Sequence, residues 1–361
     1  MKVIHLLPAL EQGGVESVVC DLVRALSGTQ EVVVSKGGRL VRRIEAAGGR
    51  HIAMDLKSKN PLTYFTRAWK LRKVLRAEKP DLVCVHSRVP AWLFVGARAL
   101  DSLLKPSNFQ TFKLSNLSWI SYAHGANSVS RYSAVMTKGD LVVAPSRFLA
   151  DYLKANYGTP EAKIRVIPNS VDFRRFDPDN LDQAFIAEKK REWGIRDGDR
   201  VIMAIGRITP VKGLEGLIRD FAARSGKDSA SPLRLVIVGG ADKRHLKYLD
   251  SLKALAKDLR RETGDVIFAG SQEKIPECIS IADEVVSGNT TKPETFGLSV
   301  VEAYAMNKPV RVARRFGGVA EVMDAVERTG CATLREAVLK LYGTDKFAER
   351  TLTAYLEACR A

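Results

Sequence analysis

The stretch Val201–Gly213, VIMAIGRITPVKG, combines the features that decide the fold of this chain. Five apolar residues form a short run typical of a buried strand, and Gly206 then opens a turn that leads into a helix-like segment. The same order of strand, turn and helix recurs along the chain. This is the pattern of a parallel sheet with helices on both faces. We therefore expect an α/β protein of the doubly wound type.

Two such domains are predicted, because 361 residues exceed what one hydrophobic core usually serves. In the first half, the apolar pattern predicts strands at Val3–Leu7, Glu31–Val34, Asp81–His86, Ser118–Ala123, Leu141–Ala144 and Ile164–Ile167. Helix-spaced apolar residues in the same half predict helices at Val15–Leu26, Tyr64–Glu78, Ala91–Leu103 and Phe148–Asn156. The second half predicts strands at Val201–Ile205, Leu233–Val238, Val266–Ala269, Glu284–Val286 and Val310–Val312. A turn-rich connector, Pro168–Asp179, separates the halves, and we place the domains at residues 1–172 and 173–344.

The composition is that of a globular protein, with 45% hydrophobic and 27% charged residues and no apolar stretch long enough to cross a bilayer. Five scattered cysteines predict neither a disulfide framework nor a zinc site, which fits a reducing cytoplasm. The net charge of +16 predicts an acidic partner. Nucleic acid, an anionic membrane face and a phosphorylated glycolipid all meet that description.

The segment Lys292–Glu302, KPETFGLSVVE, places two carboxylates eight positions apart around a turn. A helix that starts near Phe296 directs its free amides toward whatever lies beside Glu294, as in known phosphate sites. Glu302, two turns further along, could then reach a ribose. The alternative is a core helix with an incidental glutamate, because Leu298 and later apolar residues recur at helical spacing.

Two cations follow the strand in the opening stretch, and they suit a pyrophosphate. Arg207 offers a planar fork and Lys212 a mobile point charge, so both could neutralise a departing nucleoside diphosphate. Taken alone, the pair favours two solvated cations near a turn. The carboxylate segment in the same domain favours the binding interpretation.

Two motifs in the first half also follow predicted strands. Gly13-Gly14 opens a helix and exposes backbone amides, although many such pairs are only tight turns. Of the five histidines, His86 and His124 lie at strand ends, and Gly125 allows a sharp turn directly after His124. This favours His124 as a site residue.

Taken in order, these motifs resemble those of glycosyltransferase family 4 over nearly the whole chain. The resemblance rests on five stretches: Gly13-Gly14, His124-Gly125, Val143–Asp172, Gly206–Gly213 and Glu294–Glu302. Two further stretches, Asp81–Trp92 and Tyr132–Asp140, look most like lipopolysaccharide core mannosyl- or glucosyltransferases of Gram-negative bacteria.

The resemblance implies a GT-B fold, two Rossmann-like domains facing across a cleft, with a terminal helix at 345–361 that packs back on the first domain. It also implies retention of anomeric configuration, no metal, and no cofactor beyond a GDP- or UDP-linked sugar as substrate. Cations then take the role that a metal plays on the leaving diphosphate. The Asp-x-Asp motifs at Asp177 and Asp197 lie away from strand ends, which agrees with that expectation.

Residue roles follow from the same resemblance. The predicted catalytic residues are His124, Arg207, Lys212 and Glu294. His124 would contact the donor sugar, and Glu294 would lie near the transferred sugar. The predicted donor-binding residues are Gly14, Gly206, Phe296, Gly297, Leu298 and Glu302, with Glu302 on the ribose. The acceptor side is assigned to Gly13, His86 and Arg88.

The function implied is transfer of a mannose- or glucose-type hexose to a lipopolysaccharide core or similar glycolipid, by an enzyme on the inner face of the cytoplasmic membrane. A different acidic acceptor, such as nucleic acid or a soluble sugar phosphate, and a non-catalytic sugar-nucleotide-binding protein are the alternatives. Lys105–Trp119 and the cationic, aromatic segment Tyr64–Lys79 are candidate membrane contacts. We favour Lys105–Trp119, because its apolar residues have less obvious core to enter. After Glu321, the usual glycine- and proline-containing strand and loop are shortened, which leaves the last strand of the second sheet open.

Overall fold

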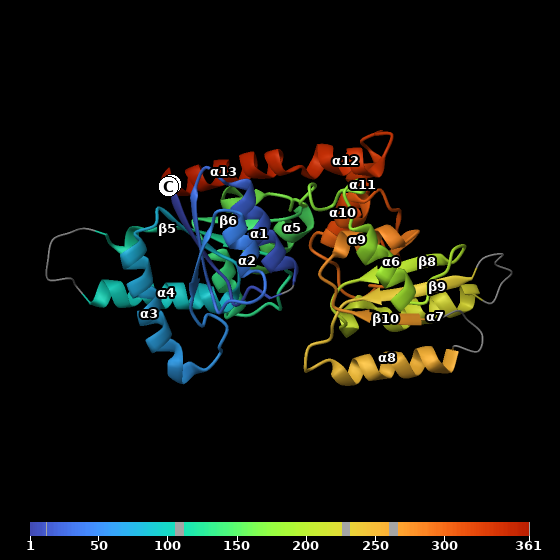
Figure 1. The fold of residues 1–361 in the computed structure, drawn as a ribbon. Helices are drawn as coiled ribbons and strands as arrows, with labels where there is room; N and C mark the ends of the chain where they lie inside the picture. The colour runs from blue at the N-terminus through green and yellow to red at the C-terminus, as the bar shows by residue number, and fades with distance from the viewer. Residues whose placement is uncertain (12, 105–111, 226–231, 260–265, 361) are drawn as a thin grey trace. The chain divides into compact units, whose positions relative to one another are not determined.

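The structure is a computed structural model that describes residues 1–11, 13–104, 112–225, 232–259 and 266–360 (Figure 1). The chain divides into two compact units. Unit 1 comprises Met1–Ser170 and Thr344–Ala361, and unit 2 comprises Val171–Gly343. The predicted boundary at residue 172 differs from the observed one by two residues. Each unit is described by itself.

Unit 1 is built on a seven-stranded parallel sheet with the order β3-β2-β1-β4-β5-β6-β7. Its strands are β1 (Lys2–Leu6), β2 (Gln30–Ser35), β3 (Arg50–Ala53), β4 (Leu82–Val85), β5 (Ser118–Tyr122), β6 (Leu141–Ala144) and β7 (Ile164–Val166). The central strands are buried on both faces, which explains their continuous runs of β-branched residues.

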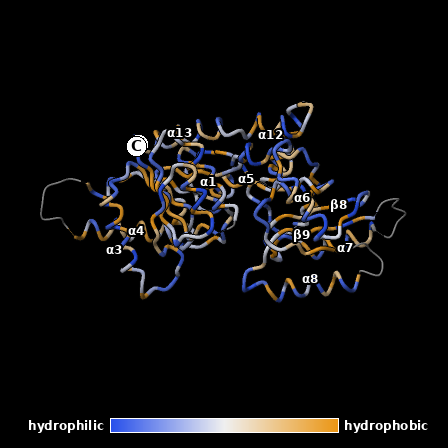
Figure 2. The backbone as a smooth tube through the Cα atoms, in the orientation of Figure 1, coloured by the Kyte–Doolittle hydropathy of each residue, from blue (hydrophilic) through white to orange (hydrophobic). Residues whose placement is uncertain are grey.

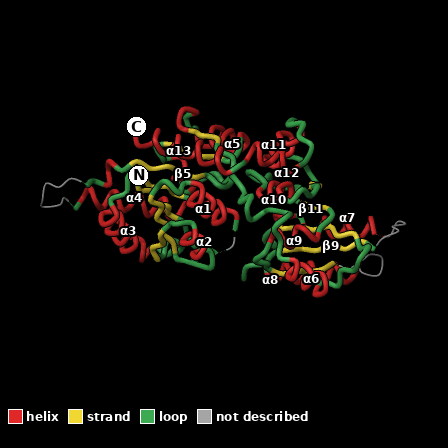
Figure 3. Tube along the Cα trace, turned by 45° about the horizontal axis from the view of Figure 1, so that its top comes forward, coloured by secondary structure: helices red, strands yellow, loops and turns green. Residues whose placement is uncertain are grey.

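Helices cover both faces of this sheet (Figure 3). They are α1 (Gly14–Ala25), α2 (Val41–Ala46), α3 (Tyr64–Glu78), α4 (Arg88–Leu103), α5 (Arg147–Tyr157) and α13 (Thr344–Arg360). α3 and α4 pack together and bury one apolar cluster against the strands. The other face holds a cluster shared by α1 and α13, so the carboxyl-terminal helix completes the core of unit 1.

Unit 2 has a five-stranded parallel sheet with the order β10-β9-β8-β11-β12. The strands are β8 (Arg200–Ile205), β9 (Leu233–Val238), β10 (Val266–Gly270), β11 (Glu284–Ser287) and β12 (Val310–Val312). The helices are α6 (Gln183–Glu192), α7 (Leu214–Ser225), α8 (Leu246–Leu259), α9 (Ile275–Ile281), α10 (Leu298–Ala305), α11 (Gly317–Glu327) and α12 (Leu334–Tyr342). One apolar cluster includes residues of α7 and α8, and another includes residues of α9 to α12.

Hydrophobic residues follow this layering in Figure 2. α8 alternates between hydrophilic and hydrophobic colours along its length, as expected for a helix with one face on a sheet. Short 3-10 turns link several elements: Pro61–Thr63, Leu114–Asn116, Ser133–Thr137, Glu161–Lys163 and Pro210–Lys212. Of the helices in the described part of the chain, none has both the length and the hydrophobicity needed to cross a lipid bilayer.

The predicted strands all form, each within two residues of its predicted ends. The pattern did not predict β3 and α2. β3 is a four-residue strand at the edge of the sheet with no fully buried residue, and α2 spans six residues with one buried side chain. The shortened region after Glu321 continues helix α11 to Glu327, so β12 is the last strand among the described residues of unit 2.

The prediction that Lys105–Trp119 contacts a membrane is wrong for the part of this segment that the structure describes. Leu114, Leu117 and Trp119 are buried and join the core beneath α3 and α4. Residues 105–111 lie outside the described residues. The apolar side chains after residue 111 do have a core to enter, formed by α3, α4 and the strands beneath them.

Candidate functional site

The turn after β8 brings backbone segments of three strand ends into close contact. Gly239 has φ +154°, and a Cβ placed there would come 1.8 Å from the carbonyl oxygen of Gly206. Gly213 has φ +63°, and a Cβ there would come 2.0 Å from the carbonyl oxygen of Gly288. Only glycine fits these approaches. The carboxyl edge of the sheet in unit 2 is therefore built from backbone, which leaves room for a ligand at the strand ends.

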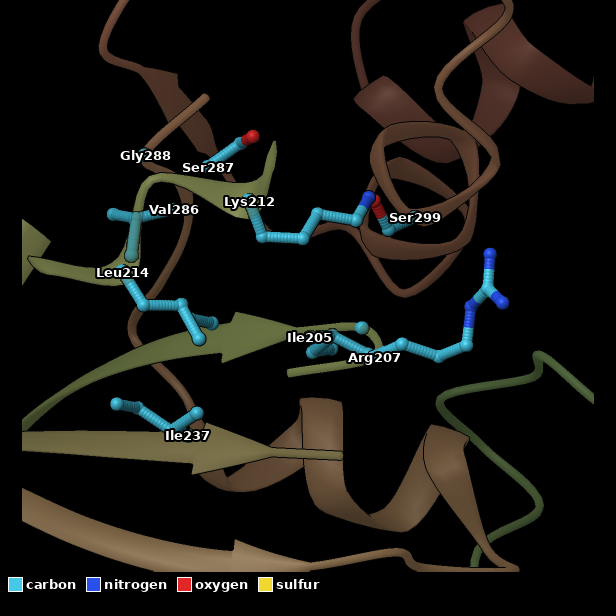
Figure 4. Close-up of a pocket in the computed structure, with 11 residues that line it drawn as sticks. Ile205, Arg207, Lys212, Leu214, Ile237, Val286, Ser287, Gly288 and Ser299 are labelled. Carbon is cyan, nitrogen blue, oxygen red and sulfur yellow. The ribbon is translucent and has the colours of Figure 1, made fainter. Parts of the chain in front are cut away.

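A small pocket opens at this edge (Figure 4). Its lining includes three predicted residues, Gly206, Arg207 and Lys212, together with Ser287, Gly288 and Ser299. Figure 4 shows the side chains of Arg207, just after β8, and of Lys212, in the following 3-10 turn, extending in the same direction, with the Lys212 ammonium beside Ser299.

Lys212 pairs with Glu294, and this contact joins the two motifs predicted in the second half. The Nζ atom of Lys212 lies 2.5 Å from Oε1 of Glu294. Lys212 ends the 3-10 turn Pro210–Lys212, and Glu294 lies in the loop before α10. Both side chains remain partly exposed, at 30% and 21%. The ammonium is thus held in place by one carboxylate while it stays open to an anionic ligand.

Helix α10 starts where the motif predicts, directly after Gly297. Gly297 adopts φ +92°, and a Cβ at this position would come 2.6 Å from a side-chain carbon of Val319. In the first turn of α10 the amides of Val300 and Val301 donate to the carbonyl oxygen of Gly297, whereas those of Leu298 and Ser299 precede the first helical hydrogen bond and can bind an anion. Phe296, by contrast, is buried and packs edge-on against Tyr342, so only its backbone is available to a ligand.

Ser299 is a pocket residue that the motif analysis did not single out. It lies three residues before Glu302, on the same side of α10, and both side chains are partly exposed while Val300 and Val301 are buried. The sequence feature that could have identified Ser299 is its position as a polar residue three positions before Glu302, the candidate ribose ligand. The pocket lining does not include Glu294, Phe296, Gly297, Leu298 or Glu302.

In unit 1, the loops after β1, β4 and β5 carry the predicted residues. Gly13 precedes α1, which begins at Gly14, and a Cβ on Gly14 would meet no atom within 4 Å. Gln12, the neighbouring residue of the motif, lies outside the described residues. Arg88 starts α4 and donates a hydrogen bond to the Ser133 hydroxyl at 3.1 Å. These residues stay candidates for contacts with donor or acceptor.

His124 is partly exposed just beyond β5, and its ring connects to a buried chain of side chains. Its Nε2 lies 3.0 Å from Nδ1 of His86. Nε2 of His86 in turn lies 2.9 Å from Nδ1 of His5. The Nε2 atom of His5 lies 2.6 Å from Oε2 of Glu31.

The assignment of His86 to the acceptor side needs correction. His86 is buried and both of its ring nitrogens are engaged by other histidines, so it cannot contact an acceptor directly. The Tyr122 ring stacks on it with centroids 4.7 Å apart. Burial is the main cause that lowers the pKa of His86 well below its ordinary value, and it lowers the pKa of His124 to about 4. Both rings are therefore neutral at neutral pH.

His5 and Glu31 had no predicted role. The sequence feature that could have identified them is a polar residue within an otherwise apolar strand. His5 is buried in β1 and Glu31 in β2. Which partners they meet depends on the strand order, which the pattern does not provide.

The two Asp-x-Asp motifs are engaged by arginines. Asp177 lies 3.4 Å from Arg335, and Asp199 lies 3.0 Å from Arg234. Within the described ranges, no group of three histidine, cysteine, aspartate or glutamate residues is arranged to hold a metal ion.

Comparison with known proteins bears on both units. Residues 12–175 match the family model for glycosyltransferase family 4, and residues 185–333 match that for glycosyl transferases group 1. A D-inositol 3-phosphate glycosyltransferase of Rhodococcus erythropolis is 30% identical over 187 residues, which is 51% of this chain and 40% of that protein. The match therefore spans about two fifths of the length of that curated relative.

Solved structures share the fold over nearly the whole chain. A glycosyltransferase from Rickettsia africae superposes with a TM-score of 0.78 at 23% identity, covering 99% of this chain and 98% of the other. Anabaena HepE in complex with UDP and glucose gives 0.71 at 19% identity, with coverage of 100% and 95%. WaaG, a glycosyltransferase involved in lipopolysaccharide biosynthesis, gives 0.60 at 14% identity, with coverage of 99% and 95%. With two parallel sheets, and with family models matching both halves, the chain belongs to the family 4 glycosyltransferases of the GT-B fold.

Proposed function

We propose that the protein is a retaining hexosyltransferase that moves a mannose- or glucose-type sugar from a nucleoside diphosphate to a glycolipid of the lipopolysaccharide core type. The Lys212–Glu294 pair carries the proposal. It holds a partly exposed cation next to a carboxylate, and Lys212 also lines a pocket at the carboxyl edge of a doubly wound sheet. In this proposal the Lys212 ammonium binds the diphosphate, and the Glu294 carboxylate lies near the transferred sugar.

The chemistry follows from charge. As the sugar–phosphate bond breaks, negative charge develops on the diphosphate, and Arg207 and Lys212 neutralise it without a metal ion. The first-turn amides of α10 add partial positive charge, and Glu302 binds the ribose. In unit 1, His124 contacts the donor sugar and Gly14 a phosphate or the acceptor. The departing diphosphate accepts the proton of the acceptor hydroxyl on the face from which it left, so the configuration is retained.

The donor is UDP- or GDP-linked, and the HepE complex with UDP and glucose supports the UDP form. The test is a thermal shift with UDP, GDP and ADP, measured separately. A nucleotide at about 100-fold over its dissociation constant stabilises the protein by roughly 2.7 kcal/mol. A clear shift with UDP or GDP supports the proposal, and no shift with any of the three contradicts it.

Turnover separates an enzyme from a sugar-nucleotide-binding protein. We expect the wild type to hydrolyse or transfer from the matching sugar nucleotide, and expect Lys212→Ala and Glu294→Ala to lose most of that activity. A donor that binds but is never turned over favours the non-catalytic alternative. Activity that survives both substitutions unchanged contradicts the site assignment.

The acceptor proposal rests on helix α3 and the 3-10 turn Pro61–Thr63 before it, which expose apolar side chains among cations. Leu62, Phe65 and Trp69 are 88%, 69% and 40% exposed. The Nζ atom of Lys73 lies 3.6 Å from the centroid of the Trp69 ring. These residues recur three or four positions apart and so share one side of the segment. Aromatic residues beside lysines suit the interface of an anionic membrane, which would place the enzyme on the inner face of the cytoplasmic membrane.

The arginines of this helix stabilise the fold. Arg67 is buried and donates to the carbonyl oxygens of Ser58 and Asn60. Arg72 and Arg76 both pair with Asp101 of α4, at 2.9 and 2.5 Å. The charge available to a membrane therefore comes from the exposed lysines rather than from the arginines.

Flotation with vesicles tests the membrane contact. The wild type should bind vesicles that contain anionic lipid at low salt, and Phe65→Ser combined with Trp69→Ser should reduce binding about tenfold or more. Leu339→Ser, which removes a comparably exposed leucine from α12, is the matched control and should bind normally. Equal binding of all three proteins contradicts the role of α3. Salt-sensitive binding to duplex nucleic acid in place of vesicles favours the nucleic acid alternative.

A further inference from the structure

A cluster of aromatic and cationic side chains lies at the carboxyl edge of the sheet in unit 1. Arg88 and Trp92 belong to α4, which begins shortly after β4. Tyr132 ends the loop that follows β5 and precedes the 3-10 turn Ser133–Thr137. His124, the predicted sugar contact, lies in the same loop. Since β4 and β5 are parallel neighbours, both segments leave the edge of the sheet where doubly wound proteins bind their ligands.

Helix α4 holds the Tyr132 ring from one side. The Trp92 ring stacks with it at an interplanar angle of 12° and a centroid distance of 6.5 Å, and Nε1 of Trp92 donates to the carbonyl oxygen of Tyr132 at 3.0 Å. The Arg88 guanidinium carbon lies 5.3 Å from the centroid of the Tyr132 ring, a cation–π distance. Arg88 and Trp92 are four positions apart and so share one side of α4. The 39% of Tyr132 that stays exposed therefore faces away from that helix.

Further hydrogen bonds fix the side chains that support this ring. Nη1 of Arg88 donates to the buried Ser133 hydroxyl at 3.1 Å, which uses one of the five N–H donors of a guanidinium. The Tyr64 hydroxyl of α3 donates to the carbonyl oxygen of Trp92 at 2.7 Å. A side chain whose neighbours are already fixed loses little freedom when a ligand binds. Tyr132 thus presents a rigid, flat surface.

The surroundings of Tyr132 suit a sugar ring better than a lipid chain. Tyr132 is the most exposed of the nine tyrosines, all of which the structure describes. Its exposed neighbours in the loop are Ser128, Val129, Ser130 and Arg131, of which only Val129 is apolar. A lipid chain requires a broad apolar surface, which this loop does not provide. A pyranose has one apolar face of C–H bonds and a rim of hydroxyls, so it matches a single aromatic ring with polar surroundings.

We propose that a sugar ring of the acceptor stacks on Tyr132, and that the Arg88 guanidinium binds an oxygen atom on the rim of that ring. Trp92 is a positioning residue that supports the Tyr132 ring. The assignment to the acceptor rests on the proposed function, which places the donor nucleotide in unit 2, whereas binding of a sugar ring does not depend on it. The acceptor is accordingly a glycolipid that already carries a sugar, rather than a lipid with a bare glycerol hydroxyl.

The first test uses the free protein and needs no activity. Protein deuterated everywhere except at its tyrosine rings is mixed with a methyl α-glycoside of glucose, mannose or galactose at millimolar concentration, and NMR measures the saturation passed from the rings to the glycoside. We expect saturation of the C–H protons on one face of at least one glycoside, and expect Tyr132→Ser to abolish it. Leu352→Ser, which removes a side chain of similar exposure from α13, is the control and should retain it. No saturation with any glycoside, or equal saturation in the Tyr132→Ser protein, overturns the proposal.

The second test measures transfer to the glycoside that binds. Tyr132→Ser should raise KM for the glycoside roughly 2- to 10-fold, whereas KM for the donor stays as in the wild type. Tyr132→Phe keeps the ring and should restore KM for the glycoside. Trp92→Leu removes the support of the ring and should raise KM for the glycoside without changing KM for the donor. A raised KM for the donor with an unchanged KM for the glycoside contradicts the assignment.

A nucleobase can also stack on an aromatic ring, so UDP and GDP are measured by the same NMR experiment. We expect no saturation of their base protons that depends on Tyr132. Base saturation that disappears in the Tyr132→Ser protein overturns the assignment of this ring to the acceptor. If the wild type turns over no donor at all, the proposed function fails, while the saturation of the glycosides still decides whether a sugar ring stacks on Tyr132.

Discussion

Replacing Lys212 by methionine tests how much of nucleotide binding depends on one charge. Methionine keeps most of the apolar stem and removes the ammonium. A phosphate oxygen about 4 Å from that ammonium gains roughly 4 kcal/mol at an effective dielectric constant near 20. That dielectric constant is appropriate because the Lys212 side chain is 30% exposed.

The net loss is smaller, because the ammonium must give up water and share its existing contact with Glu294. A hydrogen bond to a charged group contributes about 1.5–3 kcal/mol net, so the dissociation constant for UDP or GDP should rise roughly 10- to 150-fold. Folding should change by only about 0.2–1 kcal/mol, because the ion pair is partly solvated.

Isothermal titration calorimetry with UDP and GDP measures the binding loss, and chemical denaturation measures the folding change. Lys253→Met on α8 is the matched control, since that lysine is exposed and absent from the pocket lining. It should bind as the wild type does. A Lys212→Met protein that binds nucleotide within about twofold of wild type refutes the assignment of this lysine to the diphosphate.

Three further outcomes follow from the same geometry. Glu294→Gln frees the ammonium from its ion pair and removes a negative charge, so calorimetry should show tighter diphosphate binding while turnover falls; weaker binding contradicts this. Gly239→Ala forces a Cβ against the carbonyl oxygen at the end of β8, so it should destabilise the protein by about 1–3 kcal/mol, whereas Gly216→Ala on α7 meets no atom and should not. In the folded protein His86 and His124 stay neutral, whereas in the unfolded chain both rings bind a proton below the ordinary histidine pKa of 6.5. The free energy of unfolding should therefore fall as the pH is lowered from about 7 to about 5.5. The slope should approach about 1.4 kcal/mol per pH unit for each histidine, and His86→Asn should flatten it; an unchanged slope in that variant contradicts the pKa assignment.

The central strands could be predicted because they are buried on both faces, so each is a short apolar run between turns. β3 was not predicted because its four residues, RHIA, begin with two polar residues and include no buried side chain. The motifs of unit 2 could also be predicted, since Arg207, Lys212, Glu294 and the start of α10 are local features of strand ends and helix starts.

What could not be predicted depends on contacts between distant segments. His5, Glu31 and His86 meet only because β1 lies between β2 and β4, and no local pattern encodes that order. The same reason explains the membrane prediction. Trp119 looked available to a bilayer, but it packs against Phe94 of α4, with ring centroids 5.4 Å apart.

The central claim is that unit 2 binds the diphosphate of a sugar nucleotide at the end of β8. A crystal structure of the protein with UDP or GDP tests it most directly. The account predicts diphosphate oxygens within hydrogen-bond distance of the Arg207 guanidinium and the Lys212 ammonium, with the ribose at Glu302. A diphosphate bound elsewhere, with no contact to either cation, would contradict it.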